Sequence, residues 1–261
     1  MKTPFPFRLG TTSYILHDDI LPNIRFLKDK VDNIELLLFE SDQTSNYPSS
    51  STIKELNAVA ADSDLTYTVH LPLQIPLATR DEPQRRKNTE LMLRAIEATA
   101  KLNPHAWELH LEPDAILPNP MIPDIPAWQN AALKSLNEIK ASGIDPQRIG
   151  IETLEYDFQI ALPVIEQAGF GFCLDIGHIW FRRFNEGWHL KNILPRARSF
   201  HLHGFNDERD HKGLNFIPQA QLRRFTDAVS SLPDAAGRVV TIEVFSEHSF
   251  KQSMEALNAI L

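Results

Sequence analysis

The sequence has only one cysteine, Cys173, among its 261 residues, so the chain cannot form an internal disulfide. A reducing compartment suits such a protein, and we expect it to be cytoplasmic, with Cys173 as a small buried apolar residue. Its hydrophobic runs, such as Leu36–Phe39, are far shorter than the roughly 20 residues that cross a bilayer. Pro4 and Pro6 lie where a secretory signal would carry its apolar segment, so neither membrane insertion nor export is expected.

Basic residues are outnumbered, because 26 Lys and Arg stand against 34 Asp and Glu, which gives a formal net charge of −8. Nonspecific affinity for nucleic acid comes from clustered basic side chains, so this acidic excess argues against a nucleic-acid partner. With 43% hydrophobic residues, the chain has enough apolar material for one large core. We therefore expect one domain, residues 1–261, that acts on a small-molecule substrate.

Short β-rich segments alternate with amphipathic stretches along the chain, a pattern typical of a parallel sheet built from strand and helix units. Eight such units close a barrel, so the sequence predicts an α/β fold, the single-domain (β/α)8 TIM barrel. The predicted strands are Phe7–Thr12, Asn33–Phe39, Thr66–Leu71, Ala106–Leu111, Arg148–Thr153, Gly169–Asp175, Ser199–His203 and Arg238–Val244.

Between the strands, apolar residues recur every three or four positions, as in Ile20, Ile24 and Leu27, and this spacing predicts helices. The proline-rich stretch Glu112–Pro126 is interpreted as a long loop, which either shapes a substrate pocket or only packs against the barrel. The later helices are expected at Gln159–Gln167, Leu190–Leu194, Gln219–Leu232 and Phe250–Leu261, the second of these being short.

Histidines and acidic residues occupy the last positions of six predicted strands. Barrel enzymes place their reactive groups at this end of the strands, so these side chains should meet at one mouth. A single histidine beside an apolar strand is more often structural, but this many buried imidazoles and carboxylates would repel one another and lose hydration without cations between them. The pattern predicts divalent metal ions, with zinc, manganese or iron compatible. The residues are His70, His110, Glu152, Asp175, His201, His203 and Glu243.

Two further histidines lie in loops beyond the predicted strands. His178 follows Asp175 by three residues, a spacing that lets its imidazole turn back over the same mouth. His211 lies in the loop after the seventh strand, near Asp207 and Asp210, and a solvated side chain is almost as good an interpretation there. Both are candidate metal ligands.

Other side chains have a possible role in substrate binding beside a structural alternative. Arg80 and its basic neighbours Arg85 to Lys87 could meet a phosphate, or could form the solvated start of a helix. Trp180 could stack on a flat ring, or could pack between helices. Glu35 and Glu108 lie deeper in their strands and are interpreted as internal hydrogen-bonding groups.

The identity and order of these residues resemble those of a known protein family. The segments Phe172–His178 and Phe200–Leu202, together with the strand-end histidines and glutamates, are similar to the xylose-isomerase-like barrel superfamily, and in particular to its apurinic/apyrimidinic endonuclease family. The resemblance covers nearly the whole chain. It implies that His70, His110 and Glu152 hold one metal, that Glu152, Asp175, His201 and Glu243 hold a second, and that His178 and His211 help to hold a third.

The chain departs from the nuclease pattern at two positions. Arg209 stands where that pattern has an aspartate, so either Asp210 or Asp207 replaces it or the third metal is weak or missing. His203 stands where the nucleases carry a polar amide, and we expect it to contact substrate. The segments Leu9–Ile15 and Ile34–Glu40 look like the bacterial cobamide-remodelling phosphodiesterases, which implies a cobamide as substrate.

The expected reaction is hydrolysis of a phosphodiester by two or three metal ions, with Glu152, Glu243 and His178 as the catalytic side chains. The strongest alternative is a sugar isomerase or epimerase, in which one metal is held by four ligands and the two glutamates move protons beside a carbonyl. That alternative leaves His70, His110, His178 and His211 without a metal. A third hypothesis, ranked last, is a protein that binds a corrinoid or a metal without turnover.

Overall fold

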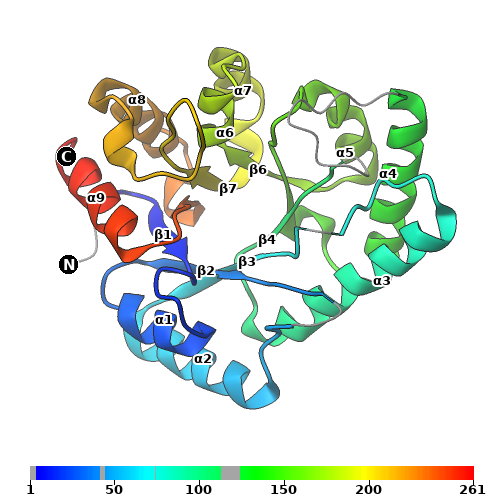
Figure 1. The fold of residues 1–261 in the computed structure, drawn as a ribbon, viewed down its shortest axis with the longest axis horizontal. Helices are drawn as coiled ribbons and strands as arrows, with labels where there is room; N and C mark the ends of the chain where they lie inside the picture. Colours follow the sequence, from blue (N-terminus) through cyan, green and yellow to red (C-terminus); the bar gives the residue numbers. More distant parts are fainter. Residues whose placement is uncertain (1–3, 42–44, 74, 113–123) are drawn as a thin grey trace.

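The computed structural model describes residues 4–41, 45–73, 75–112 and 124–261. Eight parallel strands pair in sequence order, and β8 pairs back with β1, so the sheet closes into a barrel with the helices outside it (Figure 1). The predicted TIM barrel is therefore confirmed. The strands are β1 (Arg8–Thr12), β2 (Asn33–Leu37), β3 (Thr66–His70), β4 (Trp107–Leu109), β5 (Ile149–Glu152), β6 (Gly171–Asp175), β7 (Ala197–Leu202) and β8 (Val239–Ile242).

Six of the nine described α-helices begin at a side chain that caps them. Asp81 and Asp124 accept hydrogen bonds from the backbone of Gln84 and Ala127, and a proline follows each cap in the first helical turn. None of the described helices is long and apolar enough to span a membrane. The described α-helices are α1 (Ile20–Leu27), α2 (Ser50–Ser63), α3 (Glu82–Thr99), α4 (Ile125–Ala141), α5 (Leu162–Ala168), α6 (Ile176–Phe181), α7 (Glu186–Asn192), α8 (Gln219–Ser230) and α9 (Glu247–Asn258).

The sixth unit differs from the expectation of one short helix at Leu190–Leu194. Two helices, α6 and α7, follow β6. Asp175, the last residue of β6, is also the N-cap of α6, because its side chain accepts a hydrogen bond from the His178 backbone at 2.8 Å. Most of the proline-rich stretch Glu112–Pro126 lies outside the described residues, except that its end begins α4. Several strands also end one or two residues earlier than predicted, which places His110, His203 and Glu243 just beyond them.

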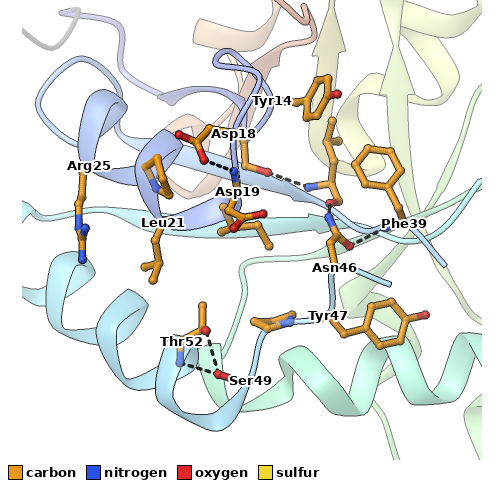
Figure 2. Close-up of a pocket in the computed structure, with 15 residues that line it drawn as sticks. Tyr14, Asp18, Asp19, Leu21, Arg25, Phe39, Asn46, Tyr47, Ser49 and Thr52 are labelled. Atoms are coloured by element: carbon orange, nitrogen blue, oxygen red, sulfur yellow. Dashed lines mark hydrogen bonds between the residues drawn. The ribbon is translucent and has the colours of Figure 1, made fainter. Parts of the chain in front are cut away.

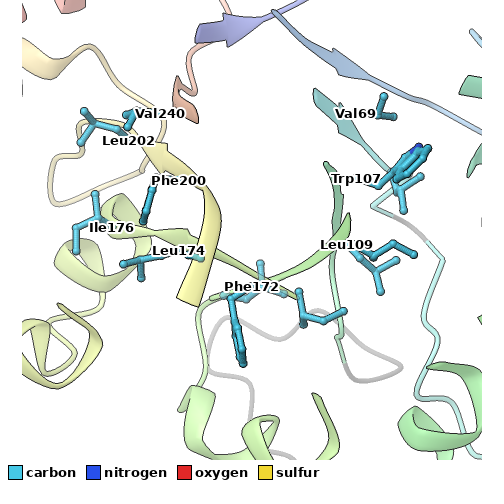
Figure 3. Close-up of a cluster of buried hydrophobic side chains, with 14 of the residues drawn as sticks. Val69, Trp107, Leu109, Phe172, Leu174, Ile176, Phe200, Leu202 and Val240 are labelled. Atoms are coloured by element: carbon cyan, nitrogen blue, oxygen red, sulfur yellow. The ribbon is translucent and has the colours of Figure 1, made fainter. Parts of the chain in front are cut away.

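Alternation along the strands separates two environments. Outward-facing residues such as Val69, Leu109 and Leu174 pack in the hydrophobic layer between the sheet and the helices (Figure 3). The residues between them turn toward the barrel axis, and many of these are polar although fully buried. The buried polar residues at such positions are Glu35, Thr68, Glu108, Asp175, Ser199, His201 and Thr241.

One basic residue near the third strand is buried rather than solvated. Arg85, on α3, is only 1% exposed, and its guanidinium donates to Ser135 and Glu138 on α4 as well as to Glu82 on its own helix. The neighbouring Arg86 is 68% exposed and pairs only with Glu82. Arg85 therefore ties α3 to α4 and is not available to bind a substrate phosphate.

Replacing this buried guanidinium tests its role in the helical layer. We expect Arg85→Met to lower the free energy of unfolding by about 2 kcal/mol, because the charge-assisted hydrogen bonds to α4 are lost. Arg86→Met removes an exposed pair, so it should leave stability unchanged. Urea unfolding followed by circular dichroism measures both variants, and equal stability of the two would contradict the assignment.

Candidate metal centre

Glu152 lies at the centre of the side chains that gather at the carboxyl ends of the strands. Its carboxylate is 1% exposed. One oxygen, Oε2, lies 3.3 Å from His70 Nε2 and 3.1 Å from His110 Nε2. The other, Oε1, lies 3.3 Å from His201 Nδ1. The two oxygens of one carboxylate therefore face two different sets of histidines.

Two further carboxylates complete the cluster. Asp175 Oδ2 lies 3.2 Å from His203 Nε2 and 3.5 Å from His178 Nδ1. Glu243 Oε2 lies 3.3 Å from His201 Nδ1 and 3.3 Å from His211 Nε2. Every strand-end residue predicted to meet at the mouth is part of this single cluster, and so are the two loop histidines.

Several overlapping groups of these side chains have ligand atoms close enough together to hold metal ions, and three of the groups match the expected metal sites. In each group, one atom of every residue lies within 4.8 Å of the others. Glu152 belongs to two of the groups, and Asp175 also belongs to two. These three groups are His70, His110 and Glu152; Glu152, Asp175, His201 and Glu243; and Asp175, His178, His203 and His211.

The unsatisfied polar atoms of the cluster fit bound cations. Asp175 Oδ2, His201 Nδ1, His203 Nε2 and Glu243 Oε2 are buried and have no hydrogen bond of acceptable geometry. Leaving a buried polar atom without a partner costs free energy, and these four atoms converge on the same space. Imidazole nitrogens and carboxylate oxygens together suit zinc, manganese or iron, so the residues fit the predicted divalent ions.

Charge compensation within the cluster is strong even without metal. Burial alone would raise the pKa of Glu152, but His201 and His110 outweigh it and hold that pKa well below its usual value. For His110, burial acts to lower the pKa, whereas the carboxylates of Glu152 and Glu112 raise it to about 10. The cluster therefore favours a protonated His110 beside an ionised Glu152.

A buried hydrogen bond beneath the centre orients His201. Its Nε2 lies 2.9 Å from Glu35 Oε2, and both side chains are completely buried. With Nε2 directed at Glu35, the other ring nitrogen, Nδ1, faces the carboxylates above. Glu35 thus occupies the internal hydrogen-bonding position predicted for it, and such a carboxylate partner typically fixes the orientation of a metal-binding histidine.

The loop after β7 shows which aspartate lies near the centre, given that Arg209 stands where the nuclease pattern has one. Asp210 Oδ1 lies 2.9 Å from His211 Nδ1, and Asp210 Oδ2 lies 3.6 Å from His178 Nε2, whereas Asp207 is exposed. Asp210, and not Asp207, is therefore the aspartate at the centre. His211 adopts a positive φ of 51°, which is uncommon outside glycine and directs its ring toward Glu243.

The three residues expected to contact substrate lie in different environments. His203 is fully buried, and its ring stacks on His211 with the centroids 4.2 Å apart, so it lies within the cluster. Arg80 is half exposed and lies 3.5 Å from Asp124. The expectation for Trp180 is corrected, because it is only 6% exposed and packs edge-on against Phe225 of α8.

Sequence reasoning missed one acidic residue at the mouth. Glu112 was interpreted as part of a loop, but its Oε1 lies 2.6 Å from His110 Nδ1. The contact fixes the side of the imidazole that faces away from Glu152. The available signal was the spacing, because Glu112 follows His110 by two residues and so continues the alternation of the strand.

Comparison with known proteins agrees with this geometry. The sequence profile described as the xylose isomerase-like TIM barrel matches residues 28–260. The chain belongs to this family. Among curated proteins, none is significantly similar to it in sequence. Since the cluster has the ligands of a metal centre and the family match covers strands β2 to β8, we take the chain to be a metal-dependent enzyme of the xylose isomerase-like family.

Solved structures share the fold of this xylose isomerase-like chain at low identity. A D-tagatose 3-epimerase-like protein is 19% identical, with a TM-score of 0.72 and 97% of each chain covered. The D-psicose 3-epimerase of Clostridium cellulolyticum is 16% identical, with a TM-score of 0.69 over 97% of this chain and 98% of that one. Endonuclease IV of Thermus thermophilus is 16% identical, with a TM-score of 0.68 over 97% of this chain and 99% of that one.

A helical glycine offers a way to disturb the centre without changing a ligand. A Cβ atom on Gly177 would lie 2.5 Å from the ring of His203, whereas one on Gly187 would meet its nearest neighbour at 3.5 Å. We expect Gly177→Ala to displace His203 and reduce the metal bound per chain, with Gly187→Ala as the matched control. Elemental analysis after dialysis measures the metal bound per chain. Unchanged metal content in Gly177→Ala would show that His203 does not contribute to metal binding.

The protonated histidines make metal affinity depend on pH. Burial alone would lower the pKa of His211, but Glu243 and Asp210 raise it well above the ordinary value. A metal ion binds only the deprotonated ring, so affinity should keep rising with pH up to the raised pKa values, about 10 for His110, and fall in acid. Calorimetry in buffers of different ionisation enthalpy should detect proton release on metal binding, and its absence would contradict the pKa directions.

Proposed function

We propose that the chain is a phosphodiesterase that hydrolyses a small nucleotide-like substrate with two or three divalent ions, zinc, manganese or iron. The observation that carries this proposal is the position of Glu152, whose Oε2 faces His70 and His110 while its Oε1 faces His201. A carboxylate shared in this way suits a bridge between two ions, and it gives His70 and His110 a role that a single-metal centre would not.

The side chains of the cluster would have different roles in such a reaction. Bound metal ions would supply electrophilic stabilisation of the phosphoryl group and activation of water. Glu152 would set the separation of two ions, while Asp175, His201 and Glu243 complete the second group. Glu243 and His178 lie at its edge, where each could hold or move a proton at the attacking or the leaving oxygen. His211 and Asp210 would steady His178 and the third group.

A cobamide is the narrower substrate that we propose, with the bond broken lying in its nucleotide loop. Its support is the resemblance of Leu9–Ile15 and Ile34–Glu40 to the cobamide-remodelling phosphodiesterases. The net charge of −8 argues against a long polyanion such as nucleic acid. We further propose a cytoplasmic location, on the grounds that the chain has a single cysteine and so forms no internal disulfide.

A sugar epimerase is the second candidate, and the structural comparisons by themselves favour it. Two of the three similar structures described above are named as 3-epimerases or as epimerase-like. The geometry is also compatible, because Glu152 and Glu243 each lie 3.3 Å from His201 Nδ1 and flank one metal position. Two carboxylates on either side of a single ion could exchange protons at neighbouring carbons of a ketose.

Metal content and the Glu152→Gln variant separate the two candidates. We expect two or more metal ions per purified chain, and we expect Glu152→Gln to abolish cleavage of a cobamide and of an aryl phosphodiester while the fold persists. The amide cannot bridge two cations as a carboxylate does. Glu166→Gln is the matched control, because Glu166 is a half-exposed glutamate paired with Arg196 on the outer surface.

Mass spectrometry of products and elemental analysis provide the measurements. About one metal per chain with interconversion of a ketose would assign the epimerase. Undiminished cleavage by Glu152→Gln would remove the bridging role. Binding of a corrinoid without any product would instead assign a binding protein.

A further inference from the structure

The candidate metal ligands lie at the carboxyl ends of strands β3 to β8. Among the described residues, the segments that follow β1 and β2 contribute none of these ligands. Large apolar side chains project there instead. We define the apolar shelf as Tyr14 after β1, Phe39 after β2, Leu73 after β3 and Phe245 after β8. These four residues come from adjacent strands around the closed barrel, so they form one continuous side of the mouth.

The apolar shelf borders a cavity of about 270 Å³ that opens directly onto the centre, because His70 and Glu243 also line it. Phe39, Leu73 and Phe245 are 45%, 46% and 37% exposed, and they make up half of the large hydrophobic residues that are exposed among those described. Exposed apolar side chains gathered at one concave place commonly mark a binding site. Apolar residues exposed at random would be spread over the surface and would not gather beside the metal centre.

Aromatic rings dominate the apolar shelf. Tyr14 and Phe39 meet edge to face with their centroids 5.9 Å apart. Phe245 stacks on His211 at 5.3 Å, with an angle of 24° between the ring planes, so the apolar wall reaches a candidate ligand. Such walls favour a flat aromatic partner over a hydroxylated sugar ring, since rings gain from stacked and edge contacts beyond the area that they bury.

Asn46 holds this wall in place. Its side-chain oxygen accepts a hydrogen bond from Phe39 N at 2.7 Å, and its amide nitrogen donates to Leu37 O at 2.8 Å. Figure 2 shows Asn46 beside Phe39, with Tyr14 on the same side of the pocket. Because both bonds are made to backbone atoms, the direction of Phe39 is fixed by the fold.

A second, outer groove of about 500 Å³ adjoins the cavity and shares Tyr14, Leu37 and Phe39 with it. The outer groove runs between the start of α1 and the start of α2 and is lined by polar side chains, including Asp19, Ser49 and Thr52 (Figure 2). Carboxylate and hydroxyl oxygens accept hydrogen bonds, so this groove suits hydroxyl or amide groups. Arg25 also lines the groove, and its guanidinium is paired with Glu55 at 3.0 Å.

We propose that the apolar shelf binds an aromatic or heteroaromatic ring adjoining the reacting group of the substrate, and that the outer groove binds a hydroxyl- or amide-bearing part beyond the ring. A cavity of about 150 Å³ already accommodates benzene in a protein core, so about 270 Å³ is ample for one ring or a fused pair. The proposal rests on the metal centre of the proposed function, which would anchor the reacting group, and not on the reaction that follows.

Binding of simple probes to the manganese-loaded protein tests this assignment. Inorganic phosphate, methyl phosphate and phenyl phosphate share the anion and differ in the group attached to it. We expect phenyl phosphate to bind about 10-fold more tightly than methyl phosphate, because its ring is buried on the apolar shelf. Phe39→Ala should reduce this preference and leave inorganic phosphate unaffected. Phe245→Ala, which also removes the ring that stacks on His211, should reduce the preference as well. Phe216→Ala removes a ring that is 48% exposed outside the cavity, so it serves as the control.

Neutral phenol provides a readout that does not need the metal centre, with saturation-transfer NMR reporting its contact with the protein. Equal binding of phenyl and methyl phosphate, with no transfer to phenol, would overturn the proposal. If none of the anions binds, the metal centre fails, and the phenol result still decides the ring site. Transfer to phenol that is lost in Phe245→Ala but kept in Phe216→Ala supports it, and transfer that survives in both variants contradicts it.

Discussion

The arrangement of side chains at the barrel mouth depends on the burial of three carboxylates, those of Glu152, Asp175 and Glu243. Each carboxylate is at most 5% exposed, so each would carry a large desolvation cost without compensating charge. Imidazoles from several strands surround them at distances of 3.1 to 3.9 Å. The closed sheet makes this possible because it brings chain segments far apart in sequence to one rim with little freedom to move. The same proximity leaves buried ligand atoms unpaired, which cations can satisfy.

The fold and most of the cluster follow from local patterns in the sequence. Strand and helix units alternate at a spacing compatible with eight units, and eight such units close a parallel barrel. Residues such as His70 and Asp175 stand at the last inward-facing positions of their strands, and parallel strands place all such positions at one end. Their convergence needed no knowledge of loop conformation, so it could be predicted. The shared position of Glu152 was implied only by a resemblance.

Features that depend on loops or on contacts between distant helices could not be predicted. Asp210 and Asp207 are equivalent in sequence, and only the turn around His211 selects Asp210. Arg85 and Arg86 are adjacent basic residues, yet Arg85 is buried against α4 and Arg86 is exposed. Trp180 has an aromatic ring that could stack on a substrate, but its position on α6, the helix that Asp175 caps, directs that ring toward α8. Side-chain direction in each case is set by tertiary packing.

The hydrogen bond between His201 and Glu35 has a consequence for how such a barrel can change over evolution. Glu35 lies within the strands and is itself 3.4 Å from Thr68 Oγ1, so the orientation of His201 is set from below, inside the barrel. The loops at the mouth can then be lengthened, shortened or exchanged without rotating this imidazole. A lineage could acquire a new specificity through its loops while the orientation of His201, set inside the barrel, is inherited unchanged.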